Sequence, residues 1–142
     1  MSLSYTKKDI PEISEKFNKN IKRLVKILDS NIVNNIPFDT LKRRISIGMK
    51  ETPIILLQKG GEFIFQYRLF IGDDNLNELF SKELSYFGNT EDLGNDANEK
   101  EIGELFNITK NIWIKFNDDE KKYTTKNFKA LLSGYSKYKS IV

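Results

Sequence analysis

The sequence predicts an all-α protein, a single compact domain of about six helices over residues 1–142 with a mobile acidic loop at 88–100. Two observations support this class. Apolar residues recur at steps of three and four along most of the chain, which is the period of one face of an α-helix. The composition, 39% hydrophobic and 30% charged, is that of an ordinary globular domain.

The first helix is expected between Ile10 and Ile32, where the apolar residues share one face and the lysines occupy the others. Pro11 is compatible with a first turn, because its missing N–H has no intrahelical partner there. Residues 34–37, Asn-Asn-Ile-Pro, then interrupt the pattern. Asp39 is expected to cap a second helix, which turns Leu41, Ile45 and Met49 inward.

Residues 53–71 allow two interpretations. As strands, PIILL and EFIFQYRLF flank a turn at Gly60–Gly61. As helices, Thr52 caps a short helix that Gly60 ends, the glycine pair takes a positive φ, and a second helix turns Ile64, Tyr67 and Ile71 inward. We favour helices, because a lone hairpin in a helical protein leaves two unpaired edges.

Three further helices complete the prediction. One follows Asp73 and Asp74 and carries Leu76, Leu79, Phe80, Leu84 and Phe87 on one face. The next is capped by Asn98 with Glu101 and places Trp113 in the core. The last begins with the same spacing at Asn117 and Glu120. Its buried face is expected to consist of Phe128, Leu131, Leu132, Tyr135 and Tyr138.

Two stretches, PIILLQKGGEFIFQYR (53–68) and NIWIKFNDDEKKYTTKNFKALL (111–132), resemble small helical proteins encoded by large nucleocytoplasmic DNA viruses. The heavy use of lysine, asparagine and isoleucine agrees with an AT-rich genome of that kind. Gly-Gly-Glu-Phe stands here where those proteins have an element similar to Gly-Pro-Tyr. The resemblance implies a helical viral protein, and it transfers no catalytic or binding residues, because those proteins have no assigned activity.

The composition also bounds the chemistry. The chain has no cysteine and no histidine. Disulfides, thiolate metal sites and the most common general base are therefore excluded. The acidic pairs Asp73–Asp74 and Asp118–Asp119 fall at predicted helix starts, where capping residues are expected. Gly60–Gly61 lacks the residues of a phosphate-binding loop. We therefore expect no catalytic site, no metal and no cofactor.

Charge is distributed unevenly along the chain. Residues 1–50 carry 11 positive and 5 negative side chains, residues 51–120 carry 6 and 15, and residues 121–142 carry 6 and none. Basic clusters of this kind bind nucleic acid where they share one surface, although lysines opposite an apolar stripe are also what any solvated helix shows. The candidate nucleic-acid-binding residues are Lys19, Lys22, Arg23, Lys26, Lys42, Arg43, Arg44, Lys121, Lys122 and Lys126, with Lys129 beside them.

The acidic middle of the chain lacks the alternating ligand positions and the closing glutamate of a calcium loop. It is expected to be a charged, mobile loop, and the sequence leaves open whether it folds against the basic helices. Its residues are Glu91, Asp92, Asp96, Glu99, Glu101 and Glu104.

The sequence therefore favours a non-enzymatic helical interaction module that acts through a protein partner or by self-association. Nucleic-acid binding by the first two helices and the last helix is the alternative. The N-terminus lacks the apolar run of a signal peptide, and no segment is apolar over a membrane-spanning length. We expect no membrane span and a location in the cytoplasm or nucleus of a host cell, or in a virion.

Overall fold

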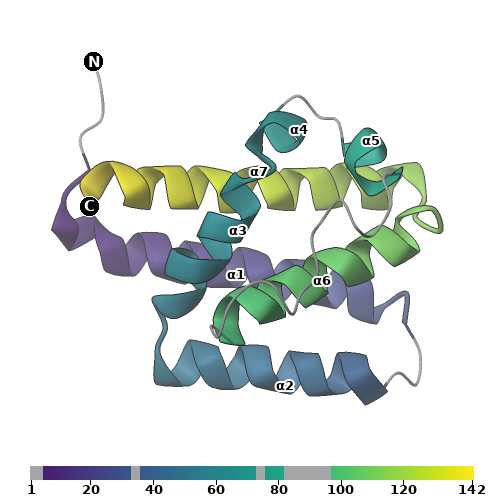
Figure 1. Ribbon diagram of the computed structural model, residues 1–142, viewed down its shortest axis with the longest axis horizontal. Coiled ribbons are helices and arrows are strands. Elements are labelled where there is room, and N and C mark those ends of the chain that lie inside the picture. The colour runs from purple at the N-terminus through teal and green to yellow at the C-terminus, as the bar shows by residue number, and fades with distance from the viewer. Residues whose placement is uncertain (1–4, 33–35, 73–75, 82–96) are drawn as a thin grey trace.

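Helices account for every regular element in the part of the chain that the structure describes. The computed structural model describes residues 5–32, 36–72, 76–81 and 97–142 (Figure 1). The all-α prediction is confirmed. In chain order the elements are the 3₁₀ turn η1 (Lys7–Asp9), α1 (Ile10–Asp29), α2 (Ile36–Glu51), the π-helical turn η2 (Leu56–Gly60), α3 (Gly61–Phe65), α4 (Arg68–Gly72), α5 (Leu76–Ser81), α6 (Ala97–Trp113) and α7 (Asp118–Ile141).

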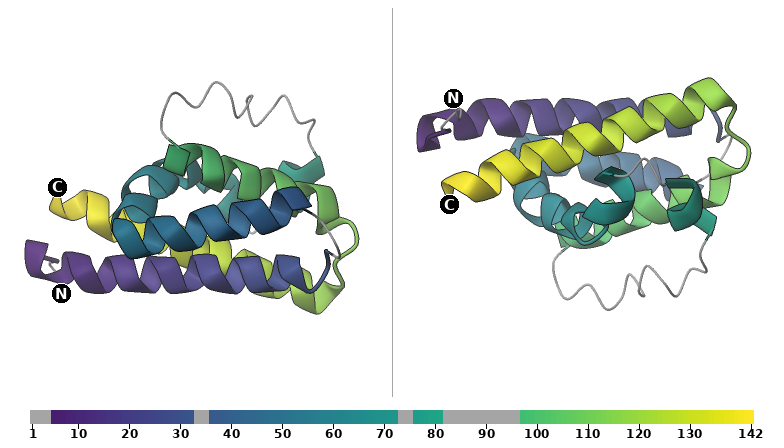
Figure 2. Two further views of the ribbon diagram at one scale, coloured as in Figure 1. Left: turned by 90° about the horizontal axis from the view of Figure 1, so that it is seen from below. Right: turned by 90° about the horizontal axis from the view of Figure 1, so that it is seen from above.

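The two longest helices, α1 and α7, lie side by side and run in opposite directions (Figure 1 and Figure 2). The predicted first helix is confirmed, and it ends at Asp29. Its apolar face is fully enclosed, with Phe17, Ile21, Leu24 and Leu28 at most 1% exposed. The neighbouring ends of the two helices are joined by Asn31, whose Nδ2 donates to Glu120 Oε2 at 2.8 Å.

Helix α2 begins earlier than the sequence pattern indicates. It starts at Ile36, so Pro37 lies in its first turn and Asp39 is not its N-cap. The expectation that Pro37 interrupts the helix is wrong for a simple reason. A first-turn residue has no intrahelical use for an N–H, and proline's fixed φ suits that position. The inward positions are confirmed, since Leu41, Ile45 and Met49 are all buried.

The segment after α2 is helical, so the hairpin alternative is wrong. Ser14 Oγ and Asn18 Nδ2, both on α1, donate to the Pro53 carbonyl at 2.9 and 2.8 Å. These two bonds hold the connection between α2 and η2 against α1. As predicted for the helical interpretation, Ile64, Tyr67 and Ile71 are buried.

Gly60 and Gly61 are inside the helical path and do not form a turn. Their φ angles are −67° and −61°, so the expected positive φ is wrong. Element η2 does end at Gly60, but α3 continues the helical path directly from Gly61. The two glycines instead permit close approach. A Cβ on Gly60 would lie 2.5 Å from Ile102 Cγ1 of α6. A Cβ on Gly61 would overlap the Tyr135 ring of α7. The pair is therefore where this segment touches two other helices.

The core is a single cluster of buried side chains centred on aromatic rings. Phe106 of α6 is 1% exposed. Its ring centroid lies 5.1–5.6 Å from those of Phe63, Tyr67, Phe80 and Phe128. These tilted, stacked and edge-on contacts are favoured by the ring quadrupoles beyond the area they bury. Phe106 thus connects α6 to α3, α5 and α7.

Two boundaries differ from the sequence prediction. Helix α6 starts at Ala97, so the last four residues of the predicted acidic loop, 97–100, are helical. Asn98 is consequently inside the helix and is not its N-cap. The rest of the predicted loop, residues 88–96, lies outside the described residues. So do Asp73, Asp74, Leu84 and Phe87 of the predicted helix that the structure describes as α5.

The close approach at Gly61 predicts a substitution effect. We expect Gly61→Ala to lower the free energy of unfolding by about 1–3 kcal/mol, because the added methyl overlaps the base of the Tyr135 side chain. Urea denaturation followed by the fluorescence of the single tryptophan measures this change. Gly72→Ala is the control, since a Cβ at that position meets nothing within 4 Å. A Gly61→Ala protein as stable as the Gly72→Ala protein would contradict the packing role.

Candidate polyanion-binding groove

An open groove of about 720 Å³ runs along the first half of α7, between this helix and α5. Trp113, at the end of α6, forms part of its wall. Four of the lining side chains are lysines and two are aspartates. The lining consists of Leu76, Asn77, Trp113, Asp118, Asp119, Lys121, Lys122, Tyr123, Thr125, Lys126 and Lys129.

The lysines reach the groove because of where α7 starts. The Asn117 side chain accepts from Glu120 N–H at 2.8 Å, and Glu120 Oε1 accepts from Asn117 N–H at 3.1 Å. The predicted capping box is therefore confirmed, and it fixes the first residue of the helix. Counted from this start, Lys122, Lys126 and Lys129 are spaced by four and three residues. They consequently share one face of the helix.

Trp113 gives the groove a fixed wall. It is 7% exposed, which confirms its predicted place in the core. Its Nε1 donates to Asn77 Oδ1 at 2.7 Å, and its ring lies 5.1 Å from that of Phe80. Lys121 Nζ stands 5.7 Å from the indole centroid, within range of a cation–π contact. One lysine of the groove is thus held over an aromatic face, and the indole cannot turn toward a ligand without breaking its bond to Asn77.

The groove carries more positive than negative charge. Asp118 and Asp119 occupy the first turn of α7, where carboxylates interact favourably with the helix dipole. The third acidic residue of that turn, Glu120, is engaged elsewhere: hydrogen bonds from Asn31 and the Asn117 backbone lower its pKa. Lys122 and Lys126 are exposed, and no described residue forms an ion pair with either. The two aspartates are therefore confined to one end of the lysine row formed by Lys122, Lys126 and Lys129.

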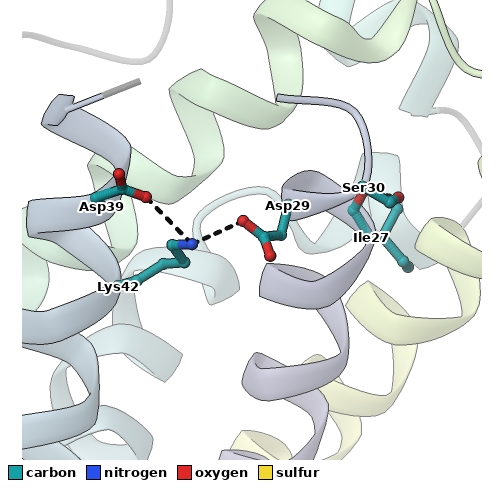
Figure 3. A network of polar contacts seen from close by, with 5 residues as sticks. All are labelled: Ile27, Asp29, Ser30, Asp39 and Lys42. Atoms are coloured by element: carbon teal, nitrogen blue, oxygen red, sulfur yellow. Dashed lines mark hydrogen bonds and ion pairs between the residues drawn. The ribbon is translucent and has the colours of Figure 1, made fainter. Parts of the chain in front are cut away.

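Two of the predicted basic residues of α2, Lys42 and Arg44, form ion pairs with neighbouring helices. Lys42 Nζ lies 2.7 Å from Asp29 Oδ1 and 3.2 Å from Asp39 Oδ1, and so joins the end of α1 to α2 (Figure 3). The hydrogen bond to Asp29 is the main reason that its pKa is raised. Arg44 Nη2 pairs with Glu104 Oε2 of α6 at 2.8 Å. These two cations stabilise contacts between helices, so a ligand would have to compete with their carboxylate partners.

The remaining predicted cations lie on other surfaces. Lys19 and Lys22 line a second groove of about 470 Å³ beside Met49 and Pro53. Lys19 also pairs with Glu15 at 3.6 Å. Lys26 and Arg23 are exposed on α1, where Arg23 Nη1 donates to Asn20 Oδ1 at 3.4 Å, and Arg43 lines a shallow hollow on α2.

The predicted basic residues therefore do not form one surface. Helices α2 and α7 lie along opposite edges of the molecule, with α1 and α6 between them (Figure 1). The structure gathers Lys121, Lys122 and Lys126 in the α7 groove and leaves the others on or near the α1–α2 side. Lys129 joins the α7 group.

Sequence reasoning did not assign Asn77 and Tyr123 to a site. Tyr123 lies outside the apolar stripe of its helix, and its 48% exposure follows from that position. An aromatic residue out of register, between lysines, was thus a usable signal. The sequence carries no such signal for Asn77, because its hydrogen bond to Trp113 depends on how α5 packs against the end of α6.

Part of the acidic cluster is described. Glu104 pairs with Arg44, and Glu101 is buried at 6% exposure. Glu91, Asp92 and Asp96 lie outside the described residues, and of Glu99 only the backbone is described. Within the described ranges, no three or more acidic side chains gather as they would around a metal ion.

Comparison of the chain with family models, curated proteins and solved structures gives no match. Among the described helices, none combines the length and the apolar character needed to cross a membrane.

The Asn31–Glu120 bond predicts a pH effect on stability. The pKa of Glu120 is lower in the folded protein than its ordinary value of 4.5, mainly because of Asn31. Its stabilising contribution is therefore present above 4.5 and is lost as the pH falls through the lowered value. We expect wild type to be more stable than Asn31→Ala at pH 6, and the difference to narrow at pH 3. Urea denaturation at both pH values measures it.

The control uses a Glu120→Gln background, in which no carboxylate titrates at this position. There the effect of Asn31→Ala on the urea midpoint should be the same at both pH values. If the stability loss caused by Asn31→Ala shrinks between pH 6 and pH 3 by the same amount with Glu120 and with Gln at this position, the pH effect comes from a group other than Glu120.

Proposed function

We propose that this protein is a non-enzymatic helical interaction module that binds a polyanionic partner in the groove along α7. The observation that carries the proposal is the set of four lysines, Lys121, Lys122, Lys126 and Lys129, lining one hollow. Cations that converge on a concave surface raise the local concentration of an anionic partner and speed its association. A viral source for the protein remains a prediction from the sequence resemblance.

The exposure of the groove lysines supports binding over covalent chemistry. A lysine becomes a nucleophile or base near neutral pH when burial or a neighbouring cation lowers its pKa. Lys122 and Lys126 are solvent-exposed in an open groove. The lining also lacks the histidine and cysteine that most often serve as base and nucleophile, since the chain has neither. These side chains suit electrostatic contact.

A second candidate function is self-association or the binding of another protein through apolar contact. Leu69 on α4 is 73% exposed, and Ile114, beyond the end of α6, is 84% exposed. Single exposed apolar residues are ordinary on protein surfaces. These two are nonetheless the most exposed large apolar side chains among the described residues, and Leu69 is only two positions from the fully buried Ile71.

The polyanion proposal is tested by titrating the protein with inorganic polyphosphate and following its intrinsic fluorescence. The chain has one tryptophan, Trp113, and it lies in the groove wall, so a ligand there changes its emission. We expect saturable binding that weakens with salt, because each lysine–phosphate contact releases counterions. Lys122→Glu with Lys126→Glu should weaken binding about 10-fold or more at low salt.

The matched control is Lys22→Glu with Lys26→Glu on α1. It changes the net charge by the same amount at exposed helical positions that are outside the groove. This pair should change the affinity by less than about 3-fold. If the α1 pair weakens binding more than the α7 pair, the cations of α1 form the binding surface and the groove assignment is wrong.

The self-association candidate is tested by sedimentation velocity over a range of protein concentrations. If Leu69 and Ile114 form a contact between copies, the sedimentation coefficient of wild type rises with concentration. Leu69→Ser with Ile114→Ser should abolish that rise, because burial of two such side chains is worth several kcal/mol at ~1.5–3 kcal/mol each. Lys115→Ser, beside Ile114, is the control. A wild-type protein that sediments as a monomer throughout would eliminate self-association.

A further inference from the structure

We infer that the polyanion held by the α7 groove is single-stranded nucleic acid, with its phosphates along the lysine row and an unpaired base against the Tyr123 ring. This inference rests on the proposed function, and it names the class of partner. Three features of the groove carry it: the line of the lysines, the wall opposite them and the exposed aromatic ring between them.

The lysine row has the length of a few nucleotides. Lys122, Lys126 and Lys129 lie on one face of α7, and at ~1.5 Å rise per residue they span about 10 Å along its axis. A nucleic-acid strand carries one charge per ~3.4 Å of axis, so this span matches about three phosphates. Asp118 and Asp119 stand at one end of the groove. They repel phosphate there and place the strand over the lysines, away from the N-terminus of the helix.

The shape of the groove favours one strand over two. A helix that reads duplex DNA enters the major groove, which is about 12 Å wide, and must therefore project from the surface of its protein. The lysine face of α7 is instead flanked by α5 and Trp113, which form the other wall of the hollow. Helix α2 lies along the opposite edge of the molecule, so its cations do not adjoin this groove (Figure 1).

Tyr123 supplies what a single strand needs besides charge. Proteins that bind single strands combine a positive groove with aromatic rings on which unpaired bases stack. Tyr123 lines the groove and is 48% exposed, so part of its ring is open to a ligand. Trp113 is nearly buried and is fixed by Asn77, so it serves as a wall and not as a stacking platform. An acidic protein has no flat base for this ring, and the bases of a duplex are paired and stacked on each other.

The test measures fluorescence anisotropy of end-labelled oligonucleotides titrated with the 142-residue chain. The ligands are single-stranded DNA, single-stranded RNA, a DNA duplex of the same sequence and labelled polyglutamate of similar charge. We expect either single strand to bind at least 10-fold more tightly than duplex or polyglutamate at equal salt. The three lysine–phosphate contacts of the row predict a slope of about −2 in the logarithm of affinity against the logarithm of salt concentration, at ~0.7 per contact.

Two variants at one position test the stacking contact. Tyr123→Leu removes the ring and keeps an apolar side chain, so single-strand affinity should fall about 5- to 100-fold. Tyr123→Phe keeps the ring and should stay within about 2-fold of wild type. Neither change should alter polyphosphate binding, because polyphosphate has no base to stack. Far-ultraviolet circular dichroism verifies that both variants remain folded.

The outcomes separate this inference from the proposed function. If polyphosphate binds but single strands bind no better than duplex or polyglutamate, the inference is overturned and the polyanion function stands. If Tyr123→Leu and Tyr123→Phe change the affinity for single strands equally, the stacking contact is also overturned. If neither polyphosphate nor any oligonucleotide binds at low salt, both proposals are wrong.

Discussion

The fold depends on one close contact, the place where the segment at Gly60–Gly61 passes between α6 and α7. Ile102 and the Tyr135 ring occupy the space that side chains at these two positions would need. Only hydrogen at both Cα atoms lets the backbone approach so closely. The η2–α3 segment can therefore deliver Phe63 and Tyr67 to Phe106, around which the aromatic core is assembled.

The same core sets the position of the groove. Phe80 packs on both Phe106 and Trp113, so the ring cluster that joins α5 to α6 also fixes the indole that walls the groove. On the other side, the Asn117–Glu120 box fixes where α7 begins, and the bond from Asn31 holds that start against the end of α1. The exposed lysines therefore project from a helix whose position is fixed. Less conformational entropy of the protein is then lost when a polyanion binds.

Much of the fold was predictable because it depends on local patterns. The apolar period defined α1 and α7, and the Asn117–Glu120 spacing located the first turn of α7. The errors have physical causes. The local pattern predicts a break at Pro37, although a first turn accepts proline. It also predicts a positive φ at the glycine pair, because close packing leaves no mark in a sequence. For the groove, the lysines of α7 were identified, but their separation from those of α1 and α2 was not.

The order of residues along the chain specifies the helical class, the inward faces of the helices and the surplus of lysine at the start of the last helix. These properties follow from the order of residues along one helix, since a period of 3.6 fixes which side chains share a face. The packing of helices against one another sets which cations form ion pairs, as with Lys42 and Arg44, and which cations line one groove. Which cations are paired and which share the groove depends on how helices distant in sequence cross. The Gly60–Gly61 contact and the aromatic cluster around Phe106 set that crossing.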